Sequence, residues 1–399
     1  MKHLIESYIY KEVSYRYQGK ELTFALSRAL FSSNTVDTGS NLLLKSLAVY
    51  KGKLSLDSIL DIGCGTGVLG ISLKKAHPEA TLLMQDRDML SVAFTRHNLQ
   101  KNGIEEAEVR GDLALHGLDG QKYSLIVSNL PAKAGFPMLA DFVRRAPEYC
   151  TDNGIVAVVI VKTLAGFLKR ELEEAEAEIL LEKPSSMHTV FFFKGGEGAF
   201  SEGLEPYIRG THPFTLLDET YVLKTVYNLP DFDTIGYDIR IAAAQIDRCG
   251  PSGRVMVMNP GQGHIPVYLL RKYSYDMSEM FITARDILSL YISANNTESY
   301  DPDFPMQMLP AASPVETAGE IEDESVHMIC SFPVPVYGVD WEEEIWNAAD
   351  KMLEPDGCLI VTGKTTPIKE FLKGRKGYRL IKKKKTRGYL SVFYRKTAG

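Results

Sequence analysis

The sequence predicts an α/β protein built from two tandem domains of one plan, each with a doubly wound, mainly parallel β-sheet. Apolar runs of strand length alternate with amphipathic segments along the chain, and this alternation is typical of parallel sheets with helices on both faces. Five segments of the first half also recur, in the same order, about 200 residues later. A period-two alternation around Gly19, within residues 8–26, predicts a β-hairpin ahead of the first sheet.

The internal repeat can be followed in the printed sequence. SILDIGCGTGVLGISLKK (58–75) resembles RVMVMNPGQGHIPVYLLRK (254–272), and RDMLSVAFTRHN (87–98) resembles RDILSLYISANN (285–296). Ordered matches at a nearly constant spacing indicate a tandem duplication. The glycine-rich stretch 194–203 has the composition of a turn or linker. We therefore expect one domain over residues 1–197 and a second over residues 198–399.

Each element of the first copy follows from its pattern. Continuous apolar runs predict buried strands, and apolar residues at helical spacing predict helices. Asn102 and Gly103 are typical of a helix end. The expected elements are strand 58–63, helix 67–77, strand 80–86, helix 89–103, strand 123–129 and strand 154–162.

Composition excludes several classes of protein. Of the 399 residues, 45% are hydrophobic and 24% are charged, which is typical of soluble globular proteins. No apolar leader and no run of about 18 apolar residues is found, so we expect a cytoplasmic protein without a membrane contact. Five scattered cysteines and eight scattered histidines show no metal-ligand spacing, which predicts reduced thiols and no metal site. Two domains can pack on each other, and we expect a monomer.

Charge is distributed unevenly. Residues 364–399 hold 13 Lys and Arg and a single acid, Glu370, a local balance of +12. Because the net charge is −6, the rest of the chain carries −18. A basic segment of this kind can contact nucleic acid or can be a solvated face with no partner. Its strand-like alternation favours a folded segment rather than a loose tail.

A glycine-rich loop, DIGCGTG (61–67), follows a predicted strand and opens a predicted helix. Its glycines allow tight turns and let a ligand approach the backbone. The helix start offers free N–H groups, and ligands of such sheets bind at the carboxyl ends of the strands. Asp86 ends the next strand, 19 residues after Gly67, where a carboxylate can accept both ribose hydroxyls.

The same loop also fits the GxGxxG pattern of dinucleotide sites, at residues 65–70. Asp61 argues for another ligand. A carboxylate at this strand end can meet a cationic methionine group, whereas it would repel a pyrophosphate. A tight strand–helix turn without any ligand is the third interpretation.

The first half resembles the class I S-adenosylmethionine (SAM) methyltransferases, which have Rossmann-like domains. It is most similar to the "methyltransferase small" family, which includes ribosomal-RNA guanine-N2 methyltransferases of the RsmC and RlmG kind and contains tandem duplications. The resemblance covers roughly residues 25–165 and rests on these segments: ALFSSNTVDTGSNLLLKSL, DIGCGTGVLGISL, LLMQDRDMLSVAFTRHNLQKNG, RGDLAL and YSLIVSNLPAKAG.

The resemblance implies a set of SAM-binding residues. Asp61 and the loop glycines would hold the cofactor, and Asp86 would bind its ribose. Asp112 would lie near the adenine amine, and Asp37 would lie near the methionine end. The complete expected set is Asp37, Asp61, Gly63, Gly65, Gly67, Asp86, Asp112 and Asn129.

The segment SNLPAKAG departs from the family pattern, which is Asn-Pro-Pro followed by an aromatic residue. By the resemblance, the Asn129 side chain and the Leu130 backbone carbonyl accept hydrogen bonds from a substrate amine, while Pro131 stiffens the turn. Such a site works by positioning and electrostatics. Ala132 cannot stack on a base, which predicts a modified site. Lys133 is either an exposed loop residue or a cation for a phosphate.

The second copy lacks the corresponding polar groups. Val257 stands at the position of Asp61, Asn259 at that of Gly63, Ala284 at that of Asp86 and Phe332 at that of Asn129. We therefore expect the second domain to bind no SAM and to serve as a structural or RNA-presenting domain. In family members with two copies, the degenerate copy comes first, so the domain order here is expected to be reversed.

The sequence therefore predicts a SAM-dependent N-methyltransferase for an exocyclic nucleobase amine, with guanine N2 of structured ribosomal RNA favoured as the substrate. Two alternatives stay open. One is a methyltransferase for a protein glutamine amide, and the other is a non-catalytic SAM- or RNA-binding assembly factor. A dinucleotide oxidoreductase is disfavoured because no hydride-transfer arrangement is evident.

Overall fold

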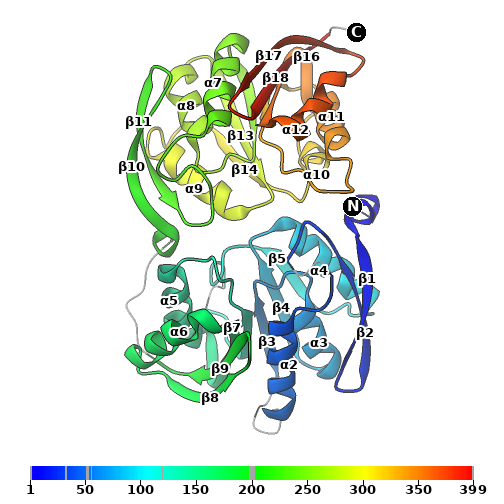
Figure 1. The fold of residues 1–399 in the computed structure, drawn as a ribbon, viewed down its shortest axis with the longest axis vertical. Helices are drawn as coiled ribbons and strands as arrows, with labels where there is room; N and C mark the ends of the chain where they lie inside the picture. The colour runs from blue at the N-terminus through cyan, green and yellow to red at the C-terminus, as the bar shows by residue number, and fades with distance from the viewer. Residues whose placement is uncertain are drawn as a thin grey trace. The chain divides into compact units, whose positions relative to one another are not determined.

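The structure is a computed structural model that describes residues 2–31, 34–50, 54, 56–118, 120–196 and 203–397. The chain divides into two compact units, Met1–Tyr207 and Ile208–Gly399. The division lies ten residues after the boundary expected from the glycine-rich stretch. Figure 1 labels the elements of both units, and each unit is described by itself.

The first unit is built on a seven-stranded sheet in the order β5-β4-β3-β6-β7-β9-β8. The first five strands of this order are parallel, and β9 runs antiparallel to both of its neighbours. The expected parallel α/β architecture is therefore confirmed. The strands are β3 (Ser58–Ile62), β4 (Thr81–Asp86), β5 (Glu108–Gly111), β6 (Tyr123–Asn129), β7 (Cys150–Val161), β8 (Glu178–Pro184) and β9 (His188–Lys194).

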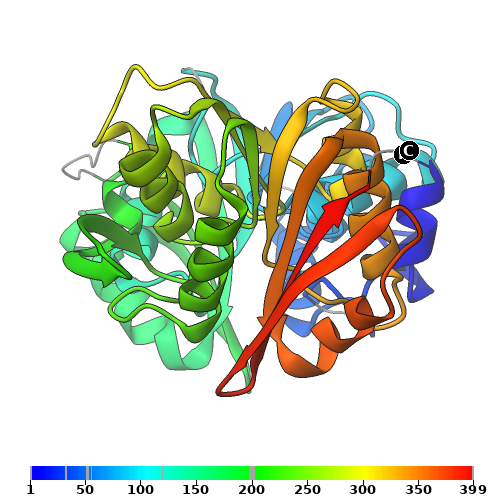
Figure 2. The same cartoon turned by 90° about the horizontal axis from the view of Figure 1, so that it is seen from above.

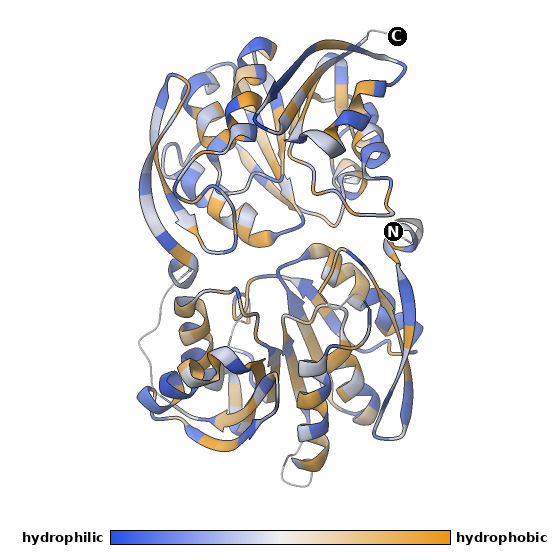
Figure 3. Ribbon diagram, in the orientation of Figure 1, coloured by the Kyte–Doolittle hydropathy of each residue, from blue (hydrophilic) through white to orange (hydrophobic). Residues whose placement is uncertain are grey.

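Helices cover both faces of this sheet. Apolar residues of α2, α3 and α4 pack on one face, and those of α5 and α6 pack on the other. The apolar residues of the sheet strands are coloured orange in Figure 3. The helices are α1 (Lys2–Tyr8), α2 (Thr38–Tyr50), α3 (Val68–Ala76), α4 (Met89–Lys101), α5 (Phe136–Arg145) and α6 (Lys162–Glu174), with short 3₁₀ turns at Ala146–Tyr149 and Glu205–Tyr207.

The expected hairpin consists of β1 (Lys11–Tyr17) and β2 (Lys20–Leu26), joined at Gln18 and Gly19, which both have positive φ. Two amide side chains of α4 fix it to the rest of the unit. Asn98 exchanges hydrogen bonds with the backbone of β2 at Ala25, and Asn102 does the same one helical turn later.

The second unit repeats the plan. Its sheet has the order β14-β13-β12-β15-β16-β18-β17, which matches the first sheet strand for strand. The strands are β12 (Gly253–Met258), β13 (Met277–Ala284), β14 (Met306–Pro310), β15 (Val326–Ser331), β16 (Leu353–Lys364), β17 (Tyr378–Thr386) and β18 (Tyr389–Lys396). The helices are α7 (Tyr237–Cys249), α8 (His264–Tyr273), α9 (Ile287–Glu298), α10 (Pro314–Gly319), α11 (Trp341–Met352) and α12 (Thr365–Ile368), followed by a 3₁₀ turn at Lys369–Lys373.

The second unit also has a hairpin, β10 (Ile208–Leu216) and β11 (Glu219–Val226), which the sequence analysis did not anticipate. Asn296 of α9 exchanges hydrogen bonds with the backbone of Lys224, as Asn98 does with Ala25 in the first unit. The hairpin is therefore part of the duplicated plan rather than an extension of the first domain.

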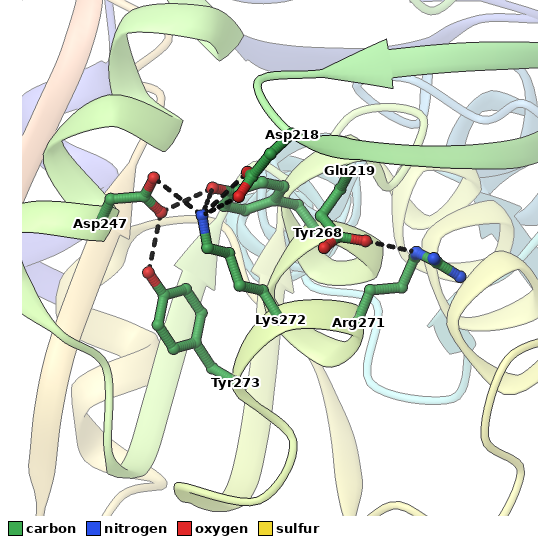
Figure 4. Close-up of polar contacts among 7 residues, drawn as sticks. All are labelled: Asp218, Glu219, Asp247, Tyr268, Arg271, Lys272 and Tyr273. Carbon is green, nitrogen blue, oxygen red and sulfur yellow. Dashed lines mark hydrogen bonds and ion pairs between the residues drawn. The ribbon is translucent and has the colours of Figure 1, made fainter.

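A polar cluster fastens the turn of this second hairpin to the helices behind it (Figure 4). The ammonium group of Lys272, in α8, bonds to Asp218 of the hairpin turn and to Asp247 of α7. Asp247 also accepts hydrogen bonds from the hydroxyls of Tyr268 and Tyr273. The hydrogen bonds from Lys272 to acids and to Tyr268 raise the pKa of its ammonium group, against the effect of desolvation. One lysine thus links three elements.

The basic C-terminal segment is folded, as its alternation predicted. It forms the antiparallel ribbon of β17 and β18, which Figure 2 shows in red. Strand β18 is buried, whereas β17 forms the sheet edge and exposes Lys382, Lys383, Lys384 and Lys385. Among the helices of the described residues, none has the length and apolar character needed to cross a membrane.

Candidate active site

The glycine-rich loop joins β3 to α3 in the first unit. Gly63, Gly65 and Gly67 all have positive φ, at 71°, 59° and 84°. A Cβ added to Gly63 or Gly65 would meet no atom of the described residues within 4 Å, so the loop presents bare backbone to open space. At Gly67 a Cβ would lie 2.6 Å from the Ile71 side chain, so this glycine is required by packing.

Asp61 lies at the end of β3 and is completely buried. Its Oδ2 atom accepts a hydrogen bond of 2.8 Å from the Gly70 amide, and its Oδ1 atom is buried without a partner among the described residues. Burial, reinforced by the charge of Asp86, raises the pKa of Asp61 to about 7. An orphaned carboxylate oxygen beside an open glycine loop is a site that favours a cation or a hydrogen-bond donor.

Asp86 lies at the end of the neighbouring strand, β4. Its two carboxylate oxygens accept hydrogen bonds of 2.8 Å from the amides of Gly65 and Asp88. Burial, and after it the charge of Asp88, raises the pKa of Asp86 to about 6. Asp112, which follows β5, donates its amide to the Asp86 carbonyl. The ends of three adjacent strands thus bring three of the expected acids to one edge of the sheet.

Asn129, the first residue of the family motif, is hydrogen-bonded to a residue far away in the sequence. The Asn129 side-chain amide donates to Asp37 Oδ2 at 2.7 Å and to Ser40 Oγ at 3.1 Å. Asp37 lies just before α2 and also accepts a hydrogen bond from the Ser40 amide. Because the amide nitrogen points toward Asp37, the Asn129 carbonyl oxygen points away from it.

The residues after Asn129 divide between core and surface. Leu130 is buried, and its amide donates to the Val159 carbonyl, which fixes the strand end. Pro131, Ala132 and Lys133 are exposed. The turn then closes with a hydrogen bond from the Ala134 amide to the Pro131 carbonyl.

An exposed aromatic residue begins the helix after this turn. Phe136 is the first residue of α5, it is 57% exposed, and its ring packs on Phe167 with the ring centroids 4.7 Å apart. The sequence analysis missed it because it looked for an aromatic at position 132. The dipeptide Gly135-Phe136 in the printed sequence was the available signal.

Three side chains behind the loop were also missed. Thr95 donates to the Gly65 carbonyl, and Asn98, besides its bonds to the hairpin, donates to the Thr66 carbonyl. Gln85 donates to the carbonyls of Leu113, Ala114 and His116, which orders the segment after Asp112. A buried amide or hydroxyl on a helix or strand was the available signal, because such groups need partners.

The equivalent loop in the second unit has another chemistry. Val257 and Ala284 are buried apolar residues at the positions of Asp61 and Asp86. Asn259 has a φ of 59°, and its side chain donates to the carbonyl of Phe332 at 2.9 Å. The ends of β12 and β15 are therefore bridged by a protein side chain where the first unit has a glycine.

Comparison with known proteins identifies relatives of this chain in sequence and in fold. The model of the methyltransferase small domain matches residues 21–178. YbxB of Bacillus subtilis, described as uncharacterized, is 30% identical over 150 residues, which are 37% of this chain and 73% of YbxB. Ribosomal RNA small subunit methyltransferase C of Aeromonas hydrophila is 34% identical over 143 residues, which are 35% of this chain and 40% of that protein.

A solved structure matches the whole chain in fold. The 16S rRNA N2 methyltransferase RsmC of T. thermophilus, in complex with AdoMet and guanosine, has a TM-score of 0.68. The match is 17% identical and covers 98% of this chain and 99% of that one. This likeness shows the tandem fold, and the residues matched by the family model lie in the first unit.

Fold and loop together define a SAM-dependent methyltransferase. The chain belongs to the methyltransferase small domain family. The residues present fit SAM as the cofactor, because, among the described residues, Gly63 and Gly65 leave open space over the loop and Asp61 has an oxygen without a partner.

Proposed function

We propose that this protein methylates an exocyclic amine of a nucleobase, with guanine N2 of ribosomal RNA as the substrate group. The observation that supports it most is the Asn129 amide, which is anchored to Asp37 so that its carbonyl oxygen can accept a hydrogen bond from a substrate. The names of the relatives and of the solved structure, which include ribosomal RNA substrates, agree with this choice.

We assign the cofactor to the strand ends of the first unit. Asp61 would attract the cationic methionine part of SAM. Asp37, which accepts a hydrogen bond from Asn129, would lie near this part. Asp86 would bind the ribose hydroxyls with the lone pairs that its two backbone contacts leave free, and Asp112 would contact the adenine amine. Gly63, Gly65 and Gly67 would let the cofactor lie on the backbone. When bound, SAM supplies a methyl group on a cationic sulfur.

The role proposed for Asn129, Leu130 and Pro131 is orientation of the amine. The lone pair of an exocyclic amine is delocalised into the base. Two carbonyl acceptors, the Asn129 side chain and the Leu130 backbone, bind its two N–H groups and direct the lone pair toward the methyl group. Pro131 fixes the backbone that carries these acceptors. Such preorganised contacts are worth roughly 100- to 1000-fold in rate, and no strong base is needed.

Phe136 is the residue that we propose in place of the aromatic missing at position 132. It starts α5, it is exposed, and Phe167 supports its ring from one side. A flipped-out base can stack on such a ring, and base–aromatic stacking is worth about 1–3 kcal/mol. The base would then stack on the first residue of α5 rather than on a residue of the motif itself.

The second unit, in this proposal, binds no SAM and supports RNA binding through the basic edge strand β17. Its four consecutive lysines are exposed, and phosphate contacts of this kind give salt-dependent affinity without sequence preference. Lysines at a sheet edge also prevent edge-to-edge pairing, so a salt titration is needed to separate the two roles.

The test is transfer of radioactive methyl groups from SAM into the RNA and protein of a strain that lacks the gene. Wild type and Asn129→Ala are compared, with Asn153→Ala, in the exposed first part of β7, as the matched control. Label in RNA that is lost only in Asn129→Ala, and that nuclease digestion assigns to N2-methylguanosine, is expected. Label in protein alone would favour a glutamine amide, and SAM binding without label in either pool would favour an assembly factor.

A further inference from the structure

Two cysteines and a histidine meet inside the second unit, although they come from three different elements. Cys249 ends α7, His327 lies in β15 and Cys358 lies in β16. The two sulfur atoms and a ring nitrogen of His327 all lie within 4.8 Å of one another. Both cysteines are buried, and the His327 side chain is 18% exposed.

The histidine is already oriented by a carboxylate. Its Nδ1 atom is 2.9 Å from Glu354 Oε1, while its Nε2 atom is buried without a hydrogen-bond partner among the described residues. A histidine that gives one ring nitrogen to a carboxylate and keeps the other unpartnered has the arrangement found around protein-bound metals. An unpartnered buried nitrogen is otherwise unfavourable.

A detour of the backbone brings Glu354 to His327, and β7 of the first unit makes the same detour between the pairs Tyr123–Cys150 and Leu125–Ile155. The pairing of β15 with β16 passes from Val326–Leu353 to Met328–Cys358, so β16 makes a detour over residues 354–357. Gly357 is needed there, because a Cβ would lie 2.9 Å from the Glu354 carbonyl oxygen.

The charges around the cluster suit a divalent cation with two thiolates. Arg395, which carries a positive charge, lies directly opposite Cys358 in the pairing of β16 with β18. Glu354 offsets that charge on the histidine side. Two thiolates and a divalent ion sum to zero, so the complete site would add no net charge to a mostly apolar interior.

The first unit offers an internal comparison. The same three positions hold Tyr50, Ser124 and Ile155, since Leu125 pairs with Ile155 as Met328 pairs with Cys358. Ser124 bonds to the backbone of Ser58, and the Tyr50 ring packs on Phe192. These are ordinary packing and backbone contacts, so the duplicated plan does not itself require a Cys-His-Cys cluster.

We propose that Cys249, His327 and Cys358 bind a zinc ion, with His327 Nε2 as the nitrogen ligand and Glu354 as its orienting partner. Zinc prefers thiolate and imidazole ligands in a tetrahedron, with Zn–S near 2.3 Å and Zn–N near 2.0 Å. Ligand atoms in such a site are roughly 3.5 Å apart, which small side-chain rotations can reach from here. A water molecule or an exogenous ligand would complete the tetrahedron.

The site would fix the end of α7 to two central strands, at the edge of the sheet opposite to the strand ends that carry the loop. Its role is therefore structural and independent of the methyl transfer proposed above. The scattered spacing of the cysteines had predicted no metal site, because spacing cannot detect ligands from separate elements.

The test uses the full chain, reduced, freed of metal with a chelator and then dialysed against zinc. We expect one zinc ion per chain by elemental analysis. With cobalt in place of zinc, we expect the thiolate-to-metal absorption bands of a tetrahedral site. Cys249→Ser, Cys358→Ser and His327→Gln should lose both signals, whereas the control Cys330→Ser, a buried cysteine of the same core cluster as Cys249 and Cys358, should keep them.

Glu354→Gln should weaken zinc binding by about 10- to 100-fold, as expected for a partner of a metal-bound histidine, and the exposed Asp323→Asn should not. If a ligand variant fails to fold, the wild type still decides: zinc should raise its melting temperature and the chelator should lower it. Wild type without bound zinc or cobalt bands overturns the proposal, as does zinc retained by the ligand variants.

Discussion

The two units share a frame and differ in the groups that can do chemistry. In both, an asparagine of the helix after the second parallel strand ties the hairpin to the glycine loop: Asn98 in the first unit and Asn296 in the second. At the strand ends, the first unit has buried carboxylates, and the second has Val257 and Ala284. The comparison teaches that the fold is maintained by contacts behind the loop, whereas ligand binding depends on side chains in front of it.

The largest expected difference between the units concerns the carboxyl end of the fourth parallel strand of each sheet. Asn129 ends β6 in the first unit, and Phe332 follows β15 in the second. Asn129→Ala should lower kcat by roughly 100- to 1000-fold, because it removes an acceptor that orients the amine. Phe332→Ala, at the equivalent position, should leave kcat unchanged. Both are measured as methyl transfer under saturating SAM and RNA. Equal losses in the two variants would mean that the second unit takes part in the chemistry.

A matched glycine pair separates folding from ligand binding. Gly65 and Gly261 have φ values of 59° and 60°, and in the part of the chain that the structure describes no atom lies within 4 Å of a Cβ added to either. Substitution by alanine should therefore cost each unit a similar 1–2 kcal/mol of stability, as expected for a left-handed residue. Only Gly65→Ala should also weaken SAM binding, by roughly 5- to 150-fold, because a Cβ then occupies ligand space at an overpacking cost of about 1–3 kcal/mol.

Thermal unfolding and calorimetric titration with SAM measure these two effects. Weaker SAM binding in Gly261→Ala, of the same size as in Gly65→Ala, would show that the second loop also binds the cofactor.

The acids of the first unit predict a pH dependence. The pKa of Asp61 is raised to about 7 and that of Asp86 to about 6, so both are protonated in the free protein at low pH. The cationic part of SAM favours ionised Asp61, and ribose hydroxyls that donate hydrogen bonds favour ionised Asp86, so protons are released when SAM binds. SAM affinity should therefore rise with pH, by up to about tenfold per unit for each proton released, and level off above pH 7.

Asp61→Asn is the corresponding variant. It should bind SAM more weakly than wild type at pH 8. Its SAM affinity should also lose the increase with pH between pH 6 and pH 7 that Asp61 causes. Calorimetry in two buffers of different ionisation enthalpy counts the protons released. A wild-type affinity that does not change between pH 5.5 and pH 8 would contradict the role of Asp61 as the partner of a cation.

The smallest expected effect concerns the lysines of the edge strand β17. Lys383→Gln/Lys385→Gln on β17 should reduce RNA affinity a few-fold and lower the slope of log affinity against log salt by about 0.7 per lost phosphate contact. The control Lys20→Gln/Lys45→Gln removes two exposed lysines of the first unit. Filter binding from low to high salt measures both. An unchanged slope in the β17 variant would mean that those lysines do not contact RNA and only prevent edge-to-edge pairing.

Much of the fold could be predicted from the sequence because its signals are local or repeated. The alternation of apolar runs gives the parallel sheet, the turn at Gly19 gives the first hairpin, and Asn102-Gly103 ends α4 as expected. The hairpin β10–β11 was missed, because its alternation has no Asn-Gly or Gln-Gly turn and instead turns at Leu217 with a φ of 55°.

The candidate site was predictable only where a motif carries it. The glycines and acids belong to short segments with a recognisable pattern. Gln85, Thr95 and Asn98 act through backbone carbonyls that lie 28 to 32 residues away or more, and no local pattern records such partners. The Cys249, His327 and Cys358 cluster shows the same limit, since its members come together only after two strands and a helix have packed.

The Asn98 amide also sets the smallest piece of the first unit that can be expected to work alone. It holds the Ala25 backbone on one side and the Thr66 carbonyl on the other. In a truncated chain that starts at the first sheet strand, the Asn98 amide would lose its hydrogen bonds to Ala25. Its support of the glycine loop at Thr66 would then no longer be fixed by the hairpin. A minimal SAM-binding fragment must therefore begin at the hairpin, and the gene segment that was copied must have included it.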